Sequence, residues 1–127
     1  MNKKNRLSIL LKAWIPPLAW ASLIFFLSSQ SVLPKFDTTL VDFFFKKLAH
    51  ISVYLVLYLL FWRAVKITHP QSNDRTQWLA PFLLCLIYAL SDEIHQSFVP
   101  GRHATLRDIG YDTLGTTIAM LWRYRYI

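Results

Sequence analysis

The chain has few cysteines and few acidic residues. It has one cysteine, Cys85, so no internal disulfide can form. Cys85 lies in an apolar run, where a cysteine usually acts as a small buried hydrophobic residue. Acidic residues are also scarce, seven against 14 lysines and arginines. No basic face with interleaved aromatic side chains accompanies this positive charge, so we do not expect nucleic-acid binding.

Repeats, low-complexity tracts and a composition break between two domains are also missing from the chain. We therefore expect one domain that covers residues 1–127. The first apolar run follows a basic start, as in a secretory signal peptide, but it ends without an Ala-x-Ala-like cleavage site. We predict that this run stays in the protein as a membrane span.

Hydrophobic residues are abundant, at 54% of the chain, and they occur in blocks. Blocks of this length are typical of membrane-spanning helices. The basic residues gather at the block edges, where they can meet lipid headgroups. We predict an all-α integral membrane bundle of four transmembrane helices, with spans at about 7–27, 43–65, 78–98 and 105–122.

Polar segments separate the predicted spans. Residues 31–42 are expected to form a loop, and residues 68–77 a polar connection. A turn around Pro100-Gly101 follows the third span. Thr105 with Asp108 matches a capping box at the start of the fourth.

The first span contains Pro16 and Pro17, which remove backbone N–H donors from its helix. Membrane helices tolerate such prolines when a neighbouring helix supplies compensating contacts. We therefore expect this helix to kink or open locally there, with neighbouring helices compensating.

The distribution of basic residues predicts the orientation of the chain in the membrane. With four spans, the side that holds both termini is the more basic one, which favours cytoplasmic termini. The end of the first span, the start of the second, the end of the third and the start of the fourth then share the outer face. Polar side chains from all four helices should converge there.

These converging residues form the candidate polar pocket. Intramembrane acids are costly and should face the bundle interior and pair with basic groups, here Lys47, His50 or Arg102. The candidate residues are Lys47, His50, Asp92, Glu93, His95, Gln96, Arg102, Asp108 and Asp112.

Helical spacing places several further residues near this pocket. Tyr54 continues the helix face of Lys47 and His50, and we expect it, like Tyr88, to be a packing residue with a satisfied hydroxyl. Gly115 and Ala119 form a small-xxx-small surface that allows close helix approach.

Several segments resemble the VanZ-like family of bacterial membrane proteins. They are Ser28-Ser29-Gln30, Lys47-Leu48-Ala49-His50, Asp92-Glu93-Ile94-His95-Gln96-Ser97-Phe98-Val99-Pro100-Gly101-Arg102 and Asp108-Ile109-Gly110-Tyr111-Asp112. The similarity extends over about residues 17–122.

The chain departs from the family pattern after His50. Ile51 stands where many members have phenylalanine, and Val53 where a common subgroup has glutamate, so a role for that glutamate is absent here. The resemblance implies a small multi-pass protein of the bacterial cytoplasmic membrane. The family's name-giving member is associated with resistance to the glycopeptide teicoplanin. Most members have no assigned reaction.

Four hypotheses account for the candidate pocket. A metal site would use the histidines and acids as ligands, but we predict no metal and no cofactor, because basic residues crowd the same place. An enzyme would use Asp92 and Glu93 for acid–base chemistry on a lipid phosphate held by Lys47 and Arg102. A purely structural or partner-docking protein would use the polar groups only to join the helix ends.

We favour the fourth hypothesis, in which the pocket binds a lipid-linked or cell-wall-related ligand without necessarily transforming it. The expected partners are the lipid bilayer and a lipid-linked cell-wall precursor. Whether the protein is an enzyme stays open at this point. Asp108 can be explained by its capping box alone, and His95 by facing the membrane interface.

Overall fold

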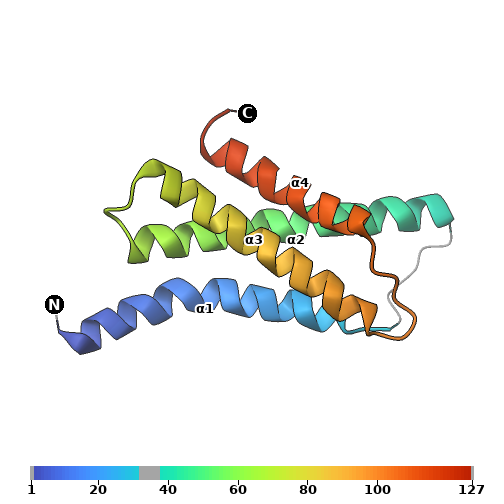
Figure 1. Ribbon diagram of the computed structural model, residues 1–127, viewed down its shortest axis with the longest axis horizontal. Coiled ribbons are helices and arrows are strands. Elements are labelled where there is room, and N and C mark those ends of the chain that lie inside the picture. Colours follow the sequence, from blue (N-terminus) through green and yellow to red (C-terminus); the bar gives the residue numbers. More distant parts are fainter. Residues whose placement is uncertain (1, 32–37, 127) are drawn as a thin grey trace.

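The structure is a computed structural model that describes residues 2–31 and 38–126. Its four helices are α1 (Lys3–Ser28), α2 (Thr39–Thr68), α3 (Asp74–Ser97) and α4 (Leu106–Arg123). The predicted all-α fold is confirmed. Figure 1 shows that the end of α1, the start of α2, the end of α3 and the start of α4 lie toward one end of the bundle. We call this the polar end.

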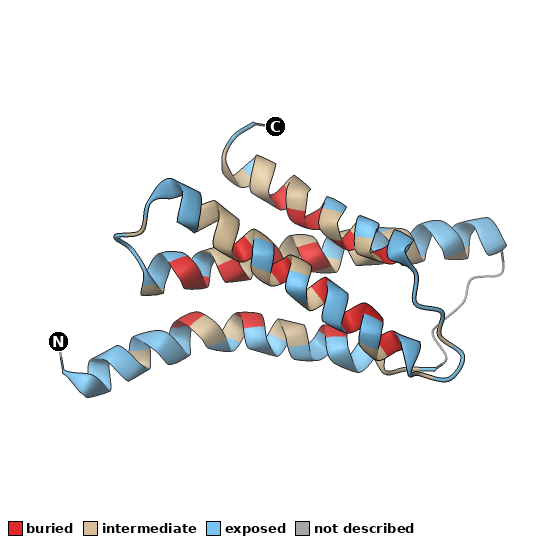
Figure 2. Cartoon of the chain, in the orientation of Figure 1, coloured by how far each residue is buried: buried red, intermediate tan, exposed pale blue. Residues whose placement is uncertain are grey.

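Three helices, α1, α2 and α3, are long and apolar enough to cross a membrane. Their buried residues lie on faces turned toward neighbouring helices, while their outward faces are exposed (Figure 2). Large apolar side chains on these outward faces, such as Ile15, Phe26 and Ile87, are 57–64% exposed. Such apolar surface fits contact with lipid, so these are helices of a multi-pass membrane protein.

The fourth helix differs from the other three in composition. It has 18 residues and includes four charged ones, Arg107, Asp108, Asp112 and Arg123. It is not among the helices apolar enough to cross a membrane by composition alone. That α4 crosses the membrane, and that both termini are cytoplasmic, stay predictions.

Two predicted boundaries are wrong, because α2 and α3 begin earlier than expected, α3 at a local cap. α3 begins at Asp74, since the Asn73 side chain accepts a hydrogen bond from the Thr76 N–H at 2.8 Å. The polar connection is therefore limited to residues 69–73. α2 begins at Thr39, so the predicted loop at 31–42 is wrong for its last residues, and residues 32–37 lie outside the described part of the chain.

α2 is the central helix and packs against each of the other three. Its core residues Tyr54, Leu57 and Tyr58 are at most 1% exposed. Cys85 from α3 is fully buried in the same cluster, as expected for a small apolar residue.

α4 approaches α2 closely at Gly115. A Cβ atom at this position would lie 2.1 Å from the Ile51 carbonyl oxygen, so only glycine fits. The predicted close approach of a small-residue surface is confirmed there.

The neighbouring helix compensates for the prolines in α1, as expected. Pro16 has no N–H to donate to the Lys12 carbonyl, four residues earlier. Arg63 of α2 donates to that carbonyl from Nη1 at 3.4 Å. The contact also fixes α1 against α2 at the end of the bundle opposite the polar end.

Candidate functional site

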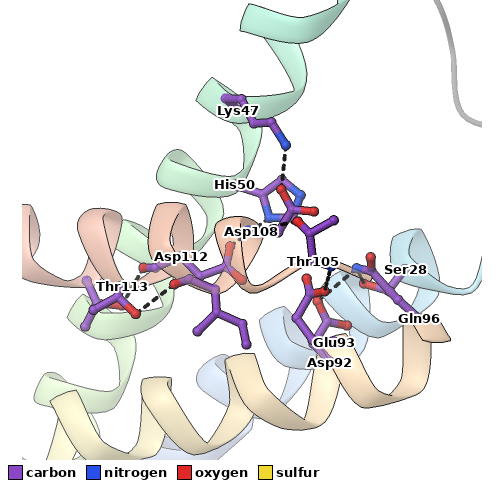
Figure 3. Close-up of polar contacts among 12 residues, drawn as sticks. Ser28, Lys47, His50, Asp92, Glu93, Gln96, Thr105, Asp108, Asp112 and Thr113 are labelled. Atoms are coloured by element: carbon purple, nitrogen blue, oxygen red, sulfur yellow. Dashed lines mark hydrogen bonds and ion pairs between the residues drawn. The ribbon is translucent and has the colours of Figure 1, made fainter. Parts of the chain in front are cut away.

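Two contacts join α2 to α4 at the polar end. Lys47 Nζ lies 2.5 Å from Asp108 Oδ1, and His50 Nδ1 lies 2.7 Å from Asp112 Oδ1 (Figure 3). The spacings match because three residues on α2 and four on α4 each make about one helical turn. Lys47 and His50 thus pair with acids as predicted.

The end of α3 is tied to the end of α1 by Gln96. Its side-chain Nε2 donates to Ser28 Oγ at 3.2 Å and to Asp92 Oδ2 at 3.3 Å. All three residues are at most 5% exposed. The amide therefore holds one Asp92 oxygen and leaves the other, Oδ1, without a hydrogen-bond partner in the described part of the chain.

Glu93 has a structural partner that was not predicted. Its Oε2 accepts a hydrogen bond from the Thr105 backbone N–H at 3.0 Å, while Thr105 Oγ1 accepts from the Asp108 N–H at 3.3 Å. The capping box of α4 is thus completed by an acid from α3. The expectation that the cap alone explains Asp108 is wrong, because the Asp108 carboxylate pairs with Lys47 instead.

Arg102 forms no ion pair with an acid in the described part of the chain. Its Nη1 donates to the Gln30 carbonyl at 3.4 Å. Arg102 therefore makes no direct ion pair with the acids of the polar end, although its charge acts on Asp92.

His95 lies outside the cavity described next. Its ring stacks on Phe25 of α1, with centroids 4.3 Å apart and an interplanar angle of 20°. This contact explains the position of His95 by packing between α3 and α1.

A cavity of about 550 Å³ opens at the polar end. Lys47, His50, Asp92, Gln96, Arg102 and Asp108 line it, whereas Glu93, His95 and Asp112 do not. The candidate set missed its other lining residues, although helical spacing had placed Tyr54, and the end of the first span Ser28, near the pocket. The missed residues are Ile24, Leu27, Ser28, Ser31, Phe45, Lys46, Ala49, Val53, Tyr54, Gly101 and His103.

Tyr54 is the most informative of the missed residues. It is 1% exposed, it lines the cavity, and its hydroxyl has no hydrogen-bond partner in the described part of the chain. The prediction of a satisfied hydroxyl is therefore wrong for Tyr54. It is confirmed for Tyr88, which donates to the Ala21 carbonyl at 2.5 Å. The helix face that Tyr54 shares with Lys47 and His50 placed it near the pocket, but it was interpreted as a packing residue.

The cavity has an apolar side and a polar side. Leu27 and Phe45 line it and are also 43% and 54% exposed on the outward faces of α1 and α2, where lipid would lie. Asp92 and Gln96 line it from the buried face of α3, near the end of that helix. A molecule with an apolar chain and a polar head could therefore occupy the cavity with its head against α3.

Metal binding finds no support in the side-chain geometry. Among the described residues, no three His, Cys, Asp or Glu side chains come together in a group that could hold a metal ion. The histidines are instead used singly, His50 with Asp112 and His95 with Phe25.

Comparison with known proteins gives one match. A protein-family model described as VanZ/LLP1 matches residues 12–125, which is nearly the whole chain. No curated protein and no solved structure matches this chain.

Proposed function

The chain belongs to the VanZ/LLP1 family, and on that premise we propose that it binds the polar head of a lipid-linked or cell-wall-related ligand. The site is the cavity at the polar end, which under this proposal faces outward from the bacterial cytoplasmic membrane. The ligand's chain would lie in the surrounding bilayer.

One observation carries this proposal. A single cavity joins outward apolar residues, Leu27 and Phe45, to a buried polar end at Asp92 and Gln96. A soluble polar molecule would gain nothing from the apolar side, and a hydrocarbon would leave the polar end unsatisfied. An amphipathic ligand satisfies both.

The charges at the cavity favour a phosphate-bearing head. Lys46, Lys47 and Arg102 all line it. The two lysines are already paired, with Asp42 at 2.7 Å and Asp108 at 2.5 Å. Arg102 is therefore the group with charge to spare, and a guanidinium can hold two phosphate oxygens at once.

Binding of a synthetic undecaprenyl-pyrophosphoryl sugar tests the proposal. We expect the purified protein in detergent to bind it in native mass spectrometry and to melt at a higher temperature in its presence. Arg102→Gln should weaken binding about tenfold or more, as expected for the loss of a charge-assisted contact. Arg107→Gln is the matched control, because Arg107 is an exposed arginine of the same end that does not line the cavity.

The same experiment separates binding from a scaffold role. If the cavity only joins helix ends or docks a protein partner, then either the parent and both arginine variants bind the lipid equally, or none of the three binds it. That result would contradict the proposal.

We also propose a link to glycopeptide resistance through this ligand. Expression in a susceptible bacterium should raise the teicoplanin concentration that stops growth, and Arg102→Gln should remove the increase. If expression of the parent protein does not change the inhibitory teicoplanin concentration, the link to resistance is contradicted, whereas the proposal of ligand binding is not.

A second candidate function is acid–base catalysis on a lipid phosphate, and Asp92 favours it. Asp92 lines the cavity, and its buried Oδ1 has no partner in the described part of the chain. Glu93 does not line the cavity and uses one oxygen in the cap of α4. If the parent converts the lipid-linked sugar into a product and Asp92→Asn does not, the result would favour catalysis over binding alone.

A further inference from the structure

We propose that the ligand's head carries a hydrogen-bond donor next to a phosphodiester, and that Asp92 and Tyr54 recognise this donor while Arg102 holds the phosphate. This inference rests on the proposed function and names the ligand class. The donor is an N–H group, as in an ammonium.

Asp92 supplies the first argument. Asp92 is buried, at 5% exposed. Oδ2 accepts from Gln96, but Oδ1 has no partner among the described residues. A buried carboxylate oxygen without a donor is costly, so a donor brought by the ligand would be strongly favoured.

Tyr54 supplies the second argument. It comes from a different helix, lines the same cavity and is 1% exposed. Its hydroxyl also has no partner in the described part of the chain, whereas the hydroxyl of Tyr88, whose ring lies 6.2 Å away, is satisfied by Ala21. A hydroxyl can both donate and accept, so it can bind the group that Asp92 binds or the oxygen next to it.

The remaining charges supply the third argument. Arg102 and Asp92 line one cavity, yet no ion pair joins them. A phosphate monoester alone could satisfy Arg102, but its second negative charge would be repelled by Asp92. A phosphodiester whose esterified group bears a donor satisfies the cation and the anion together.

A comparison of two phospholipids tests the hydrogen-bond donor separately from the phosphate. Phosphatidylethanolamine and phosphatidylcholine have the same phosphodiester and the same net charge, but only the former has N–H donors. We expect the parent protein in detergent to bind phosphatidylethanolamine about tenfold more tightly in native mass spectrometry. Water-soluble glycerophosphoethanolamine is a third probe, because it shows whether the head binds without its chains.

Variants assign the preference to residues. Asp92→Leu removes the acceptor and a buried charge, so it should fold and bind the two phospholipids equally. Tyr54→Phe should reduce the preference several-fold. Arg102→Gln should weaken the binding of both lipids by the same factor and leave the ratio of their affinities unchanged. Asp92→Asn, which keeps an oxygen acceptor, should retain part of the preference.

The outcomes separate this inference from the function on which it rests. One outcome is that the parent binds the two phospholipids equally and Arg102→Gln binds both more weakly. This would overturn the proposed donor recognition and would still support the ligand site. Binding of neither phospholipid would also overturn the inference, and the undecaprenyl-linked sugar would then decide the proposed function by itself. If glycerophosphoethanolamine binds as tightly as phosphatidylethanolamine, the ligand is a soluble phosphodiester and its lipid chains contribute nothing to binding.

Discussion

The buried acids of the polar end differ in their contacts, and the contacts indicate different roles. Asp108 and Asp112 face basic groups of α2, at 2.5 and 2.7 Å. Glu93 completes a helix cap. Asp92 alone among these acids is both lining the cavity and without a basic partner within the described residues. It is therefore the acid best suited to meet a ligand.

Glu93 provides a prediction at the scale of single residues. Glu93→Gln keeps an oxygen that can accept from the Thr105 N–H, so the free energy of unfolding should change by less than about 0.5 kcal/mol. Glu93→Met removes the acceptor and should lower that free energy by about 1 kcal/mol, the usual cost of a lost cap. Unfolding in detergent measures both. Equal losses in the two variants would mean that the charge of Glu93, and not its role as acceptor, is what matters.

Residue types and spacing predicted part of this site. The pairs of Lys47 and His50 follow from the cost of a lone charge in the membrane and from helical periodicity. The partner of Glu93 could not be predicted, because it depends on how α3 and the turn before α4 meet in space. Tyr54 was misjudged for a related reason, since periodicity places a side chain on a face but does not say whether a neighbour satisfies its hydroxyl.

At the scale of helices, the contact between α2 and α4 depends on one glycine. A Cβ at Gly115 would meet the Ile51 carbonyl oxygen at 2.1 Å, and that oxygen belongs to rigid helix backbone. The clash cannot be relieved by turning a side chain, so the helices must move apart.

Gly115→Ala should therefore lower the free energy of unfolding by about 1–3 kcal/mol, as overpacking does. It should also weaken the contacts of Lys47 and His50 with α4. Gly110→Ala is the matched control in the same helix, where an added Cβ meets nothing within 4 Å. That change should stabilise α4 by about 0.5–1 kcal/mol. Thermal unfolding of both variants in detergent is the measurement, and a harmless Gly115→Ala would refute the close approach.

The existence and type of all four helices could be read from the apolar blocks, but their ends could not. Helix ends depend on caps such as Asn73 and on whether polar residues extend a helix beyond the membrane. The start of α2 shows the second effect, because Thr39 begins a helix in a segment whose composition indicates a loop.

At the scale of the whole molecule, alternating helix direction brings four polar segments together. That convergence followed from counting spans, and Figure 1 shows it in space. The side of the membrane that the polar end faces is a separate matter, because it depends on charge bias and on no contact within the bundle.

Cysteine labelling tests the orientation. Ala104→Cys and Gln71→Cys place exposed thiols at opposite ends of the bundle, and the native Cys85 is fully buried. We expect a membrane-impermeant maleimide to label Ala104→Cys in intact bacteria, and Gln71→Cys only after lysis. The parent chain, with Cys85 alone, is the unlabelled control. The reverse pattern would put the cavity on the cytoplasmic side.

The pairing of α2 with α4 also has a consequence for synthesis at the ribosome. Lys47 and its partner Asp108 are 61 residues apart in the chain. At about 5–20 residues per second, α2 would wait on the order of 3–12 s for the helix that neutralises it. For that interval the nascent chain holds Lys47 and His50 beside lipid without their acids, and α4, with its four charged residues, enters last. If α4 enters the membrane as predicted, we therefore expect it to find its place by meeting α2, and not by its own affinity for the bilayer.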